Sequence, residues 1–214
     1  MKLRHAVILA AILVTAAISS CTMKPVSAVP ARISFISGSV FVNGKDAVLG
    51  QTVTNGDVIE TRSMSACRVI VDDKNILALQ DDCTLVYRIH IEDPLLDLKK
   101  GVLAIIVKNR KNIENLRVST PTMTAGVRGT VFVLGAEGPD RVYTCLCNGV
   151  IHYHPEGQAK GERYAAAHHK GVYFTRRGGT VAAEPGEMKY HTDEDIEKLA
   201  SDINVRIDWT KIEE

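Results

Sequence analysis

The amino-acid sequence predicts an all-β domain, built as a rolled or solenoid-like antiparallel sheet and followed by a short C-terminal helix. Apolar and polar residues alternate with period two from residue 32 to about residue 175, as expected of half-buried strands. Short strands separated by frequent turn signals are typical of sandwiches, barrels and solenoids. A glycine followed by an apolar strand recurs at Gly38, Gly101, Gly129 and Gly149. This recurrence at irregular spacing favours the rolled or solenoid-like sheet, with a β-sandwich as the alternative.

Ten strands are expected, each bounded by turn residues. Asn43-Gly44 is one of the turn signals, and Asn148-Gly149 predicts a tight hairpin, because an Asn-Gly pair readily takes positive φ at both central positions of the turn. In chain order the expected strands are Ser39–Val42, Val58–Thr61, Cys67–Val71, Ile76–Leu79, Thr84–Ile89, Val102–Val107, Leu116–Thr120, Thr130–Leu134, Val142–Cys147 and Val150–His154.

The chain changes character after Pro185-Gly186, where the helix is expected. Thr192 is a favourable N-cap residue, and the three acidic residues after it suit the positive end of a helix dipole. Ile196, Leu199 and Ile203 recur at three- and four-residue spacing, which gives a narrow apolar stripe over about three turns. We expect this stripe to pack against the β domain.

The first residues predict export. Lys2 and Arg4 give the sequence a short basic start, and residues 6–17 form an apolar run that is too short to span a bilayer and is typical of a signal peptide. The small residues before Cys21 resemble a bacterial lipobox, in which cleavage makes the cysteine the lipidated N-terminus. Thr22 follows in place of an aspartate, which favours attachment to the outer membrane, facing the periplasm. We therefore expect a lipoprotein signal peptide over residues 1–20, a tether over 21–31, the β domain over 32–184 and a helical appendage over 185–214.

Charge and cysteine content narrow the function. The 26 basic residues nearly cancel the 25 acidic ones, so no nucleic-acid surface is expected. Without Cys21, four cysteines remain, an even number in an oxidising compartment, which favours disulfides. Cys67 and Cys83 could bridge to each other, or each could bridge to Cys145 or Cys147.

Cysteines and histidines gather around the expected Asn148-Gly149 hairpin. A two-residue turn there would place Cys147 opposite Val150, Cys145 opposite His152 and Tyr143 opposite His154, with all six side chains on one sheet face. A tetrahedral zinc, copper or iron site could use the two cysteines with two histidines. Structural disulfides and free thiols are the alternatives, and no standard metal motif is matched. The candidate ligands are Cys145, Cys147, His152, His154, His168 and His169.

A second motif lies in residues 118–133. Thr120-Pro121 requires an extended backbone before the proline, and glycines then bracket Val127 and Arg128 before an apolar strand resumes. This predicts a strand, a bend that holds one arginine, and a second strand. The pattern resembles the signature of the FecR domain family, carried here by Thr120, Pro121, Gly126, Val127, Arg128, Gly129 and Thr130, with looser likeness from Arg32 to His154.

The resemblance implies a periplasmic β-rich domain. Proteins of the FecR type transmit a signal from an outer-membrane transporter to an inner-membrane regulator of a sigma factor, and they carry a cytoplasmic region before one transmembrane helix. Here a signal peptide opens the sequence instead, so direct contact with a sigma factor is not expected.

The expected function is therefore that of a non-enzymatic binding or sensing lipoprotein. The sequence contains no nucleophile elbow, P-loop or dinucleotide fingerprint. An envelope protein partner would be recognised through sheet edges and loops such as that around Arg128. The alternative is a metal-binding or redox lipoprotein that uses the Cys/His cluster.

Overall fold

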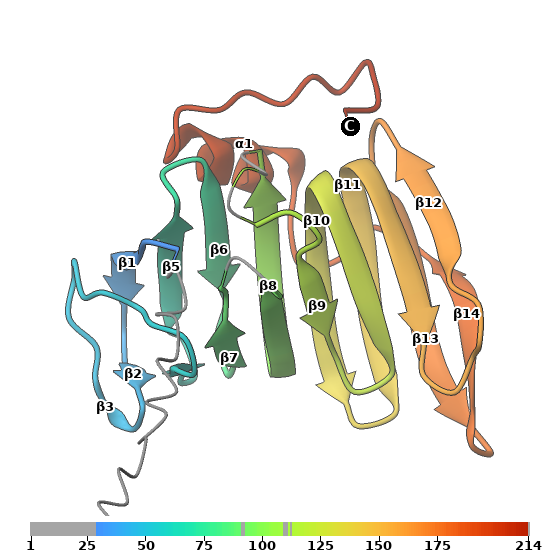
Figure 1. Ribbon diagram of the computed structural model, residues 1–214, viewed down its shortest axis with the longest axis horizontal. Helices are drawn as coiled ribbons and strands as arrows, with labels where there is room; N and C mark the ends of the chain where they lie inside the picture. Colours follow the sequence, from blue (N-terminus) through green and yellow to red (C-terminus); the bar gives the residue numbers. More distant parts are fainter. Residues whose placement is uncertain (1–28, 91–92, 109–110, 112, 214) are drawn as a thin grey trace, which may run out of the picture.

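A computed structural model describes residues 29–90, 93–108, 111 and 113–213. The predicted signal peptide, Cys21 and most of the predicted tether lie outside these residues. Within the described part, no helix is long and apolar enough to cross a membrane. Strands dominate this part and one short helix follows them (Figure 1), which confirms the all-β class with a C-terminal helix.

All of the strands belong to a single open sheet, antiparallel except where β8 pairs with β9. The elements are β1 (Ala31–Ser37), β2 (Val40–Val42), β3 (Lys45–Asp46), β4 (Val58–Thr61), β5 (Ala66–Val71), β6 (Asn75–Leu79), β7 (Thr84–Arg88), β8 (Leu95–Val107), β9 (Arg117–Ser119), β10 (Met123–Gly138), β11 (Arg141–Pro155), β12 (Glu162–Ala166), β13 (Lys170–Arg177), β14 (Thr180–Gly186) and α1 (Asp193–Ser201).

The sheet rolls over itself into two layers. The first layer contains β1, β5, β6, β13 and β14, and the second contains β2, β3, β4, β7, β9 and β12. The three longest strands, β8, β10 and β11, pass from one layer to the other. Ile105 and Phe132 of the first layer share one buried core with Ile59, Leu96 and Tyr153 of the second. The rolled sheet is therefore also sandwich-like in its packing.

Glycines form the corners of the roll. β8, β10 and β11 change layer at Gly101, Gly129 and Gly149, whose φ angles are +87°, +62° and +111°. Gly38, with φ +69°, makes the same change between β1 and β2. Glycine is suited to these corners because it takes positive φ without steric cost. The four glycines that each precede an apolar strand in the sequence are therefore the four corners.

The predicted hairpin at Asn148-Gly149 is wrong. Both residues lie inside β11, where the positive φ of Gly149 serves a corner with a register shift and not a chain reversal. Asn148 is buried, and its Nδ2 donates to the carbonyls of Ala167 (2.8 Å) and Lys211 (2.9 Å). The bend predicted beside Arg128 is the corner at Gly129, within the continuous strand β10.

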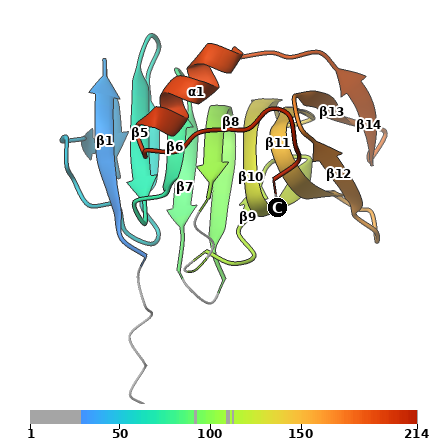
Figure 2. The same cartoon turned by 90° about the horizontal axis from the view of Figure 1, so that it is seen from above.

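The C-terminal segment, residues 187–213, covers the outer face of the first layer. Thr192 caps α1 in a capping box with Asp195, as its sequence predicts. Ile196 and Leu199 pack into a second buried cluster with outward-facing residues of β5, β6, β8, β10 and β11. Figure 2 shows α1 and the chain after it running across one side of the sheet.

The β fold extends slightly beyond the expected boundaries of residues 32 and 184. Val29 and Ala31 are buried in the main core, and β14 continues to Gly186. Pro185-Gly186, expected at the start of the appendage, therefore lies at the end of a strand.

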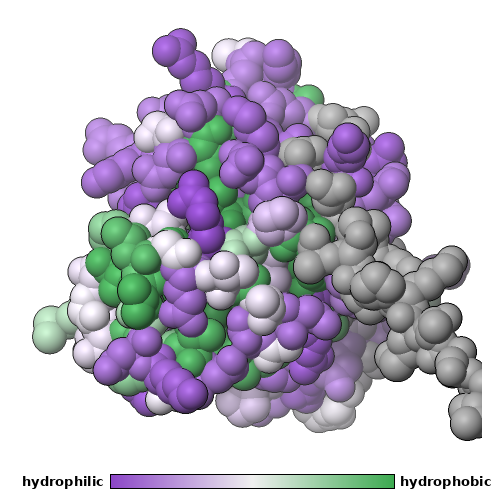
Figure 3. All heavy atoms as spheres, turned by 60° about the vertical axis from the view of Figure 1, so that its left-hand side comes forward, coloured by the Kyte–Doolittle hydropathy of each residue, from purple (hydrophilic) through white to green (hydrophobic). Residues whose placement is uncertain are grey.

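Some large apolar side chains remain exposed near the end of the molecule that carries β1 to β3. They include Phe35, Val48, Leu49 and Met64. Figure 3 looks at this side and shows hydrophobic residues interspersed with hydrophilic ones. The guanidinium of Arg68 lies 4.8 Å from the centroid of the Phe35 ring, which is therefore partly covered. Exposed apolar residues of this kind are common on soluble domains.

Candidate functional sites

Two thiols and two imidazoles meet between the sheet and the C-terminal segment. Cys145 and Cys147 point from β11 into the second buried cluster. His169 ends the loop between β12 and β13, where its backbone N–H donates to the carbonyl of Cys147 (3.1 Å). His191 directly precedes the N-cap of α1. One sulfur or ring-nitrogen atom from each of the four residues lies within 4.8 Å of the others.

Three of the separations between these atoms are close to those of ligands around one tetrahedral ion. Cys145 Sγ lies 3.5 Å from His169 Nδ1, and Cys147 Sγ lies 3.3 Å from His191 Nε2. The two ring nitrogens are 3.3 Å apart. Zinc bonds of about 2.3 Å to sulfur and about 2.05 Å to nitrogen, at tetrahedral angles, place S and N about 3.6 Å apart and two N atoms about 3.3 Å apart.

Each histidine has a second partner that fixes its tautomer. His191 Nδ1 donates to the carbonyl of Lys189 (2.8 Å), and His169 Nε2 donates to Asp193 Oδ1 (2.5 Å). In the neutral form of each imidazole, this placement of the proton leaves a lone pair on His191 Nε2 and on His169 Nδ1, facing the thiols. Metal-ligating histidines are commonly oriented by such carbonyl and carboxylate acceptors.

The electrostatics of the cluster differ from those of ordinary buried thiols. Hydrogen bonds from Cys147, His169 and His191 lower the pKa of Cys145, although burial opposes this shift. Burial raises the pKa of Cys147, as does the neighbouring Cys145. Burial disfavours a charge on His169, but its bonds to Cys145 and Asp193 outweigh burial and raise its pKa. The cluster therefore concentrates negative charge at sulfur next to imidazole.

Cys67 and Cys83 lack such surroundings. Both are buried in the main core, and burial raises the pKa of each thiol to about 12. The four cysteines among the described residues are free. The predicted disulfides, including the one proposed for Cys67 and Cys83, are therefore not present in this structure.

The structure brings together only three of the six predicted ligands, Cys145, Cys147 and His169. His152 and His154 lie on the exposed outer face of the second layer, because β11 continues past Gly149 where a hairpin had been expected to fold back. His168 contacts Asp193 Oδ2 (3.0 Å) but does not join the two thiols. His191, which the sequence reasoning missed, takes the remaining place. Its only sequence signal is its position just before a capped helix whose apolar stripe was expected to pack on the sheet.

Most of the FecR-like motif serves the fold. Thr120 Oγ1 donates to the carbonyl of Met123 (2.7 Å) and closes the turn before β10. The carbonyl of Pro121 accepts from Arg176 Nη2 (2.6 Å), and Thr130 Oγ1 donates across the corner to the carbonyl of Val150 (2.6 Å). The other motif residues are Gly126, which is partly buried, Val127, which is in the core, and Gly129, which forms a corner.

Arg128 is the exception in this motif. Its side chain is exposed, and within the described part of the chain it forms no ion pair or hydrogen bond. On the outer face of the second layer, Gly126 lies between Arg117 on one neighbouring strand and His152 on the other. His152 in turn lies opposite Arg163 on the next strand. We define this basic face by the outward-facing residues Arg117, Arg128, His152, His154 and Arg163.

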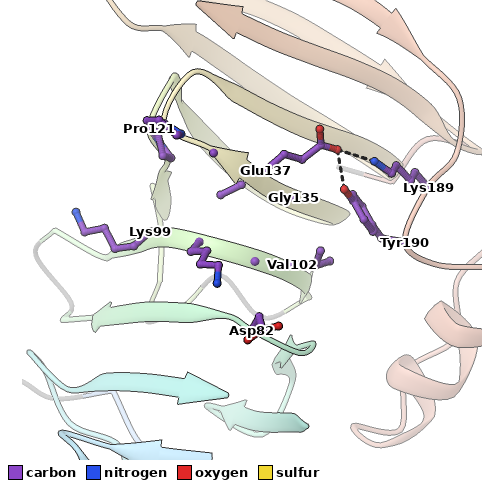
Figure 4. Close-up of a pocket in the computed structure, with 13 residues that line it drawn as sticks. Asp82, Lys99, Val102, Pro121, Gly135, Glu137, Lys189 and Tyr190 are labelled. Carbon is purple, nitrogen blue, oxygen red and sulfur yellow. Dashed lines mark hydrogen bonds and ion pairs between the residues drawn. The ribbon is translucent and has the colours of Figure 1, made fainter. Parts of the chain in front are cut away.

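A groove of about 780 Å³ opens beside the corner at Gly101 (Figure 4). Its carboxylate Glu137 accepts from Lys189 Nζ (2.7 Å) and from the hydroxyl of Tyr190 (2.6 Å). Both partners belong to the C-terminal segment. Glu137 therefore joins this segment to β10.

Comparisons with known proteins agree with the rolled β architecture and its motif. Residues 57–151 match the family model described as FecR protein, so the chain carries a FecR domain from β4 into β11. This confirms the resemblance expected from residues 118–133. The match includes Cys145 and Cys147 but ends before His169 and His191.

Solved structures share this fold. Two crystal structures, at 1.65 Å and 2.50 Å resolution, of a "putative anti-sigma factor" from Parabacteroides distasonis ATCC 8503 superpose with TM-scores of 0.51 and 0.50. Each is 14% identical in sequence, over 61% of this chain and 60% of that protein, so the likeness concerns the fold alone. A search of curated proteins found no matching sequence.

Proposed function

We propose that the chain is a non-enzymatic binding or sensing module of the bacterial cell envelope, anchored through Cys21 as an outer-membrane lipoprotein that faces the periplasm. The FecR domain supports a role in signalling. The basic and apolar segments before Cys21 support export and lipidation. Stable anchoring requires more than one acyl chain, as a lipidated N-terminal cysteine provides. In this arrangement the module acts on another envelope protein and does not contact a sigma factor directly.

The observation that carries this proposal is the exposed side chain of Arg128, which has no hydrogen-bond or ion-pair partner among the residues that the structure describes. Its neighbours in the motif hold the turn, the core and the corner, whereas the side chain of Arg128 forms no hydrogen bond or ion pair with the described residues. A guanidinium presents five donors and pairs well with carboxylates. The basic face around it therefore suits an acidic surface of a protein partner, for which complementary charge accelerates association and fixes register.

Site-specific photo-crosslinking in the native bacterium tests the partner. A photoreactive residue at position 128 or 152 should give the same discrete adduct, because both positions belong to the basic face. A probe at Thr180, which is exposed at the start of β14 on the other layer, is the matched control. The adduct at 152 should disappear when Arg128 is changed to glutamate. Adducts that are equal at all three positions, or that survive this change, would contradict the proposal.

The anchor is tested separately. Metabolic labelling with a radioactive fatty acid should mark the wild-type chain but not Cys21→Ser, and the labelled protein should fractionate with outer membranes. An unlabelled wild-type chain would refute lipidation without affecting the partner proposal.

A further inference from the structure

We propose that Cys145, Cys147, His169 and His191 bind one zinc ion, and that this ion fastens the C-terminal segment to the outer face of the sheet. The site does not depend on the partner proposed above, since it lies on the opposite layer from Arg128. Three ligands come from the β domain and the fourth, His191, comes from the C-terminal segment, 44 residues after Cys147.

The donor set favours zinc. Two thiolates and two neutral imidazoles form a closed tetrahedral set, which is typical of structural zinc sites, and they leave no position open for substrate. Two thiolates also neutralise the charge of a divalent ion, which reduces the cost of burying it. Cys145, Cys147 and His191 are buried, and His169 is partly buried. Outside the ligands, Asp193 and the carbonyl of Lys189 hold the two imidazoles in orientation.

A disulfide between the same two cysteines fits the strand less well. Residues two apart in an extended strand have Cα atoms separated by about 6.6 Å, near the upper limit for a disulfide. The backbone at Cys145 also pairs with a neighbouring strand on each side, opposite Val133 of β10 and Gly171 of β13. The bridge would require this central strand to buckle, whereas a metal ion uses the geometry already present.

The ion would add a strong link to a segment that is otherwise held by apolar packing and by hydrogen bonds. The hydroxyl of Tyr143 donates to the carbonyl of Glu187 (2.8 Å), and Gln80 Nε2 donates to the carbonyl of Tyr190 (2.7 Å). The nine-residue helix α1 is too short to be stable alone and depends on its packing against the sheet. Because His191 stands directly before its N-cap, a ligand bond there fixes the start of the helix.

Metal content is the first test. The full chain, purified without chelators and reconstituted with zinc, should contain about one ion per molecule. Cys147→Ser and His191→Ala should each lower zinc affinity at least about tenfold. Cys83→Ser and His152→Ala are matched controls, since they alter a buried thiol and a histidine outside the cluster, and both should retain zinc. No zinc in the reconstituted wild type, or equal zinc in Cys147→Ser, would overturn the proposal.

X-ray absorption at the zinc edge provides a test that needs no variant. The wild-type chain should show two sulfur and two nitrogen neighbours, even if a substitution at Cys147 prevents folding. A shell of oxygen and nitrogen without sulfur would overturn the assignment.

Hydrogen exchange tests the fastening role. With zinc bound, amides of α1 should exchange more slowly than after chelation, while β4 and β7, which lie in the other layer, should change little. His191→Ala should exchange in α1 like the chelated wild type. If zinc is bound but the protection of α1 does not change, the metal site stands and its fastening role is refuted.

Discussion

Replacing Gly101 by alanine should destabilise the protein more than replacing Gly44, although both glycines have positive φ. Gly101 forms a corner of the roll with φ +87°, and Gly44 lies in the β2–β3 turn with φ +73°. A side chain at Gly44 would meet nothing within 4 Å. A Cβ at Gly101 would lie 2.5 Å from Cys83 Cα and 2.8 Å from the carbonyl oxygen of Asp82. Only the corner glycine is therefore required by close backbone approach.

The loss of folding free energy has two parts, one from the left-handed backbone and one from crowding at the corner. A left-handed backbone costs a residue with a side chain about 1–2 kcal/mol at either position, and the loss of glycine flexibility in the unfolded chain offsets about 0.4–1 kcal/mol in both variants. At Gly101 the contact with backbone atoms adds about 1–3 kcal/mol, as for an overpacked core. This extra term corresponds to a further decrease in Tm of roughly 2–12 °C, at about 2–4 °C per kcal/mol for a protein of this size.

Thermal and urea unfolding, followed by circular dichroism at a fixed saturating zinc concentration, would measure the difference. Gly44→Ala controls for the φ penalty and for any general effect of alanine. Equal decreases in stability for the two variants would refute the argument that crowding at the corner requires glycine.

Four further outcomes are expected. Asp193→Ala should weaken zinc binding about 10- to 100-fold by removing the acceptor that orients His169, whereas Glu194→Ala should not; competition with a chelating dye measures both. Thr130→Val should cost about 1–3 kcal/mol in urea unfolding, because the buried carbonyl of Val150 loses its donor. Arg128→Ala should change unfolding free energy by less than about 0.5 kcal/mol, because the side chain is exposed and unpaired. Acid should release zinc as thiolates and imidazoles take up protons, which a pH titration of bound metal would detect.

The fold was predictable to the extent that short-range signals have one structural meaning. The period-two pattern indicates a strand, and the capped apolar stripe of α1 indicates an amphipathic helix. An Asn-Gly pair, in contrast, is compatible with more than one structure. Asn43-Gly44, expected as a turn, forms a two-residue hairpin with Val42 opposite Lys45, whereas Asn148-Gly149, expected as a hairpin, lies inside a strand. Glycine at positive φ suits a turn and a bulged corner equally, and the choice between them depends on which strands pair on either side.

The candidate site shows the same division between local and tertiary information. Cys145 and Cys147 share a face because side chains alternate along a strand, and that part of the prediction needs no tertiary structure. The imidazoles come from a loop and from the C-terminal segment, which are brought to the thiols only by the pairing of β11 with β13 and by the packing of α1. His152 and His154 were expected beside the cysteines because a two-residue turn at Asn148-Gly149 would fold them back onto the same face, whereas the corner at Gly149 places them on the other layer.

The position of this corner also separates the two proposed sites. Before Gly149, β11 runs in the first layer and presents Cys145 and Cys147 to the C-terminal segment. After Gly149 it runs in the second layer and presents His152 beside Arg128 on the basic face. The FecR match ends on this strand, before the last two metal ligands. The C-terminal segment therefore completes a site that the matched region only begins, and it covers the layer opposite the basic face, so that metal binding and partner binding can take place on the same molecule.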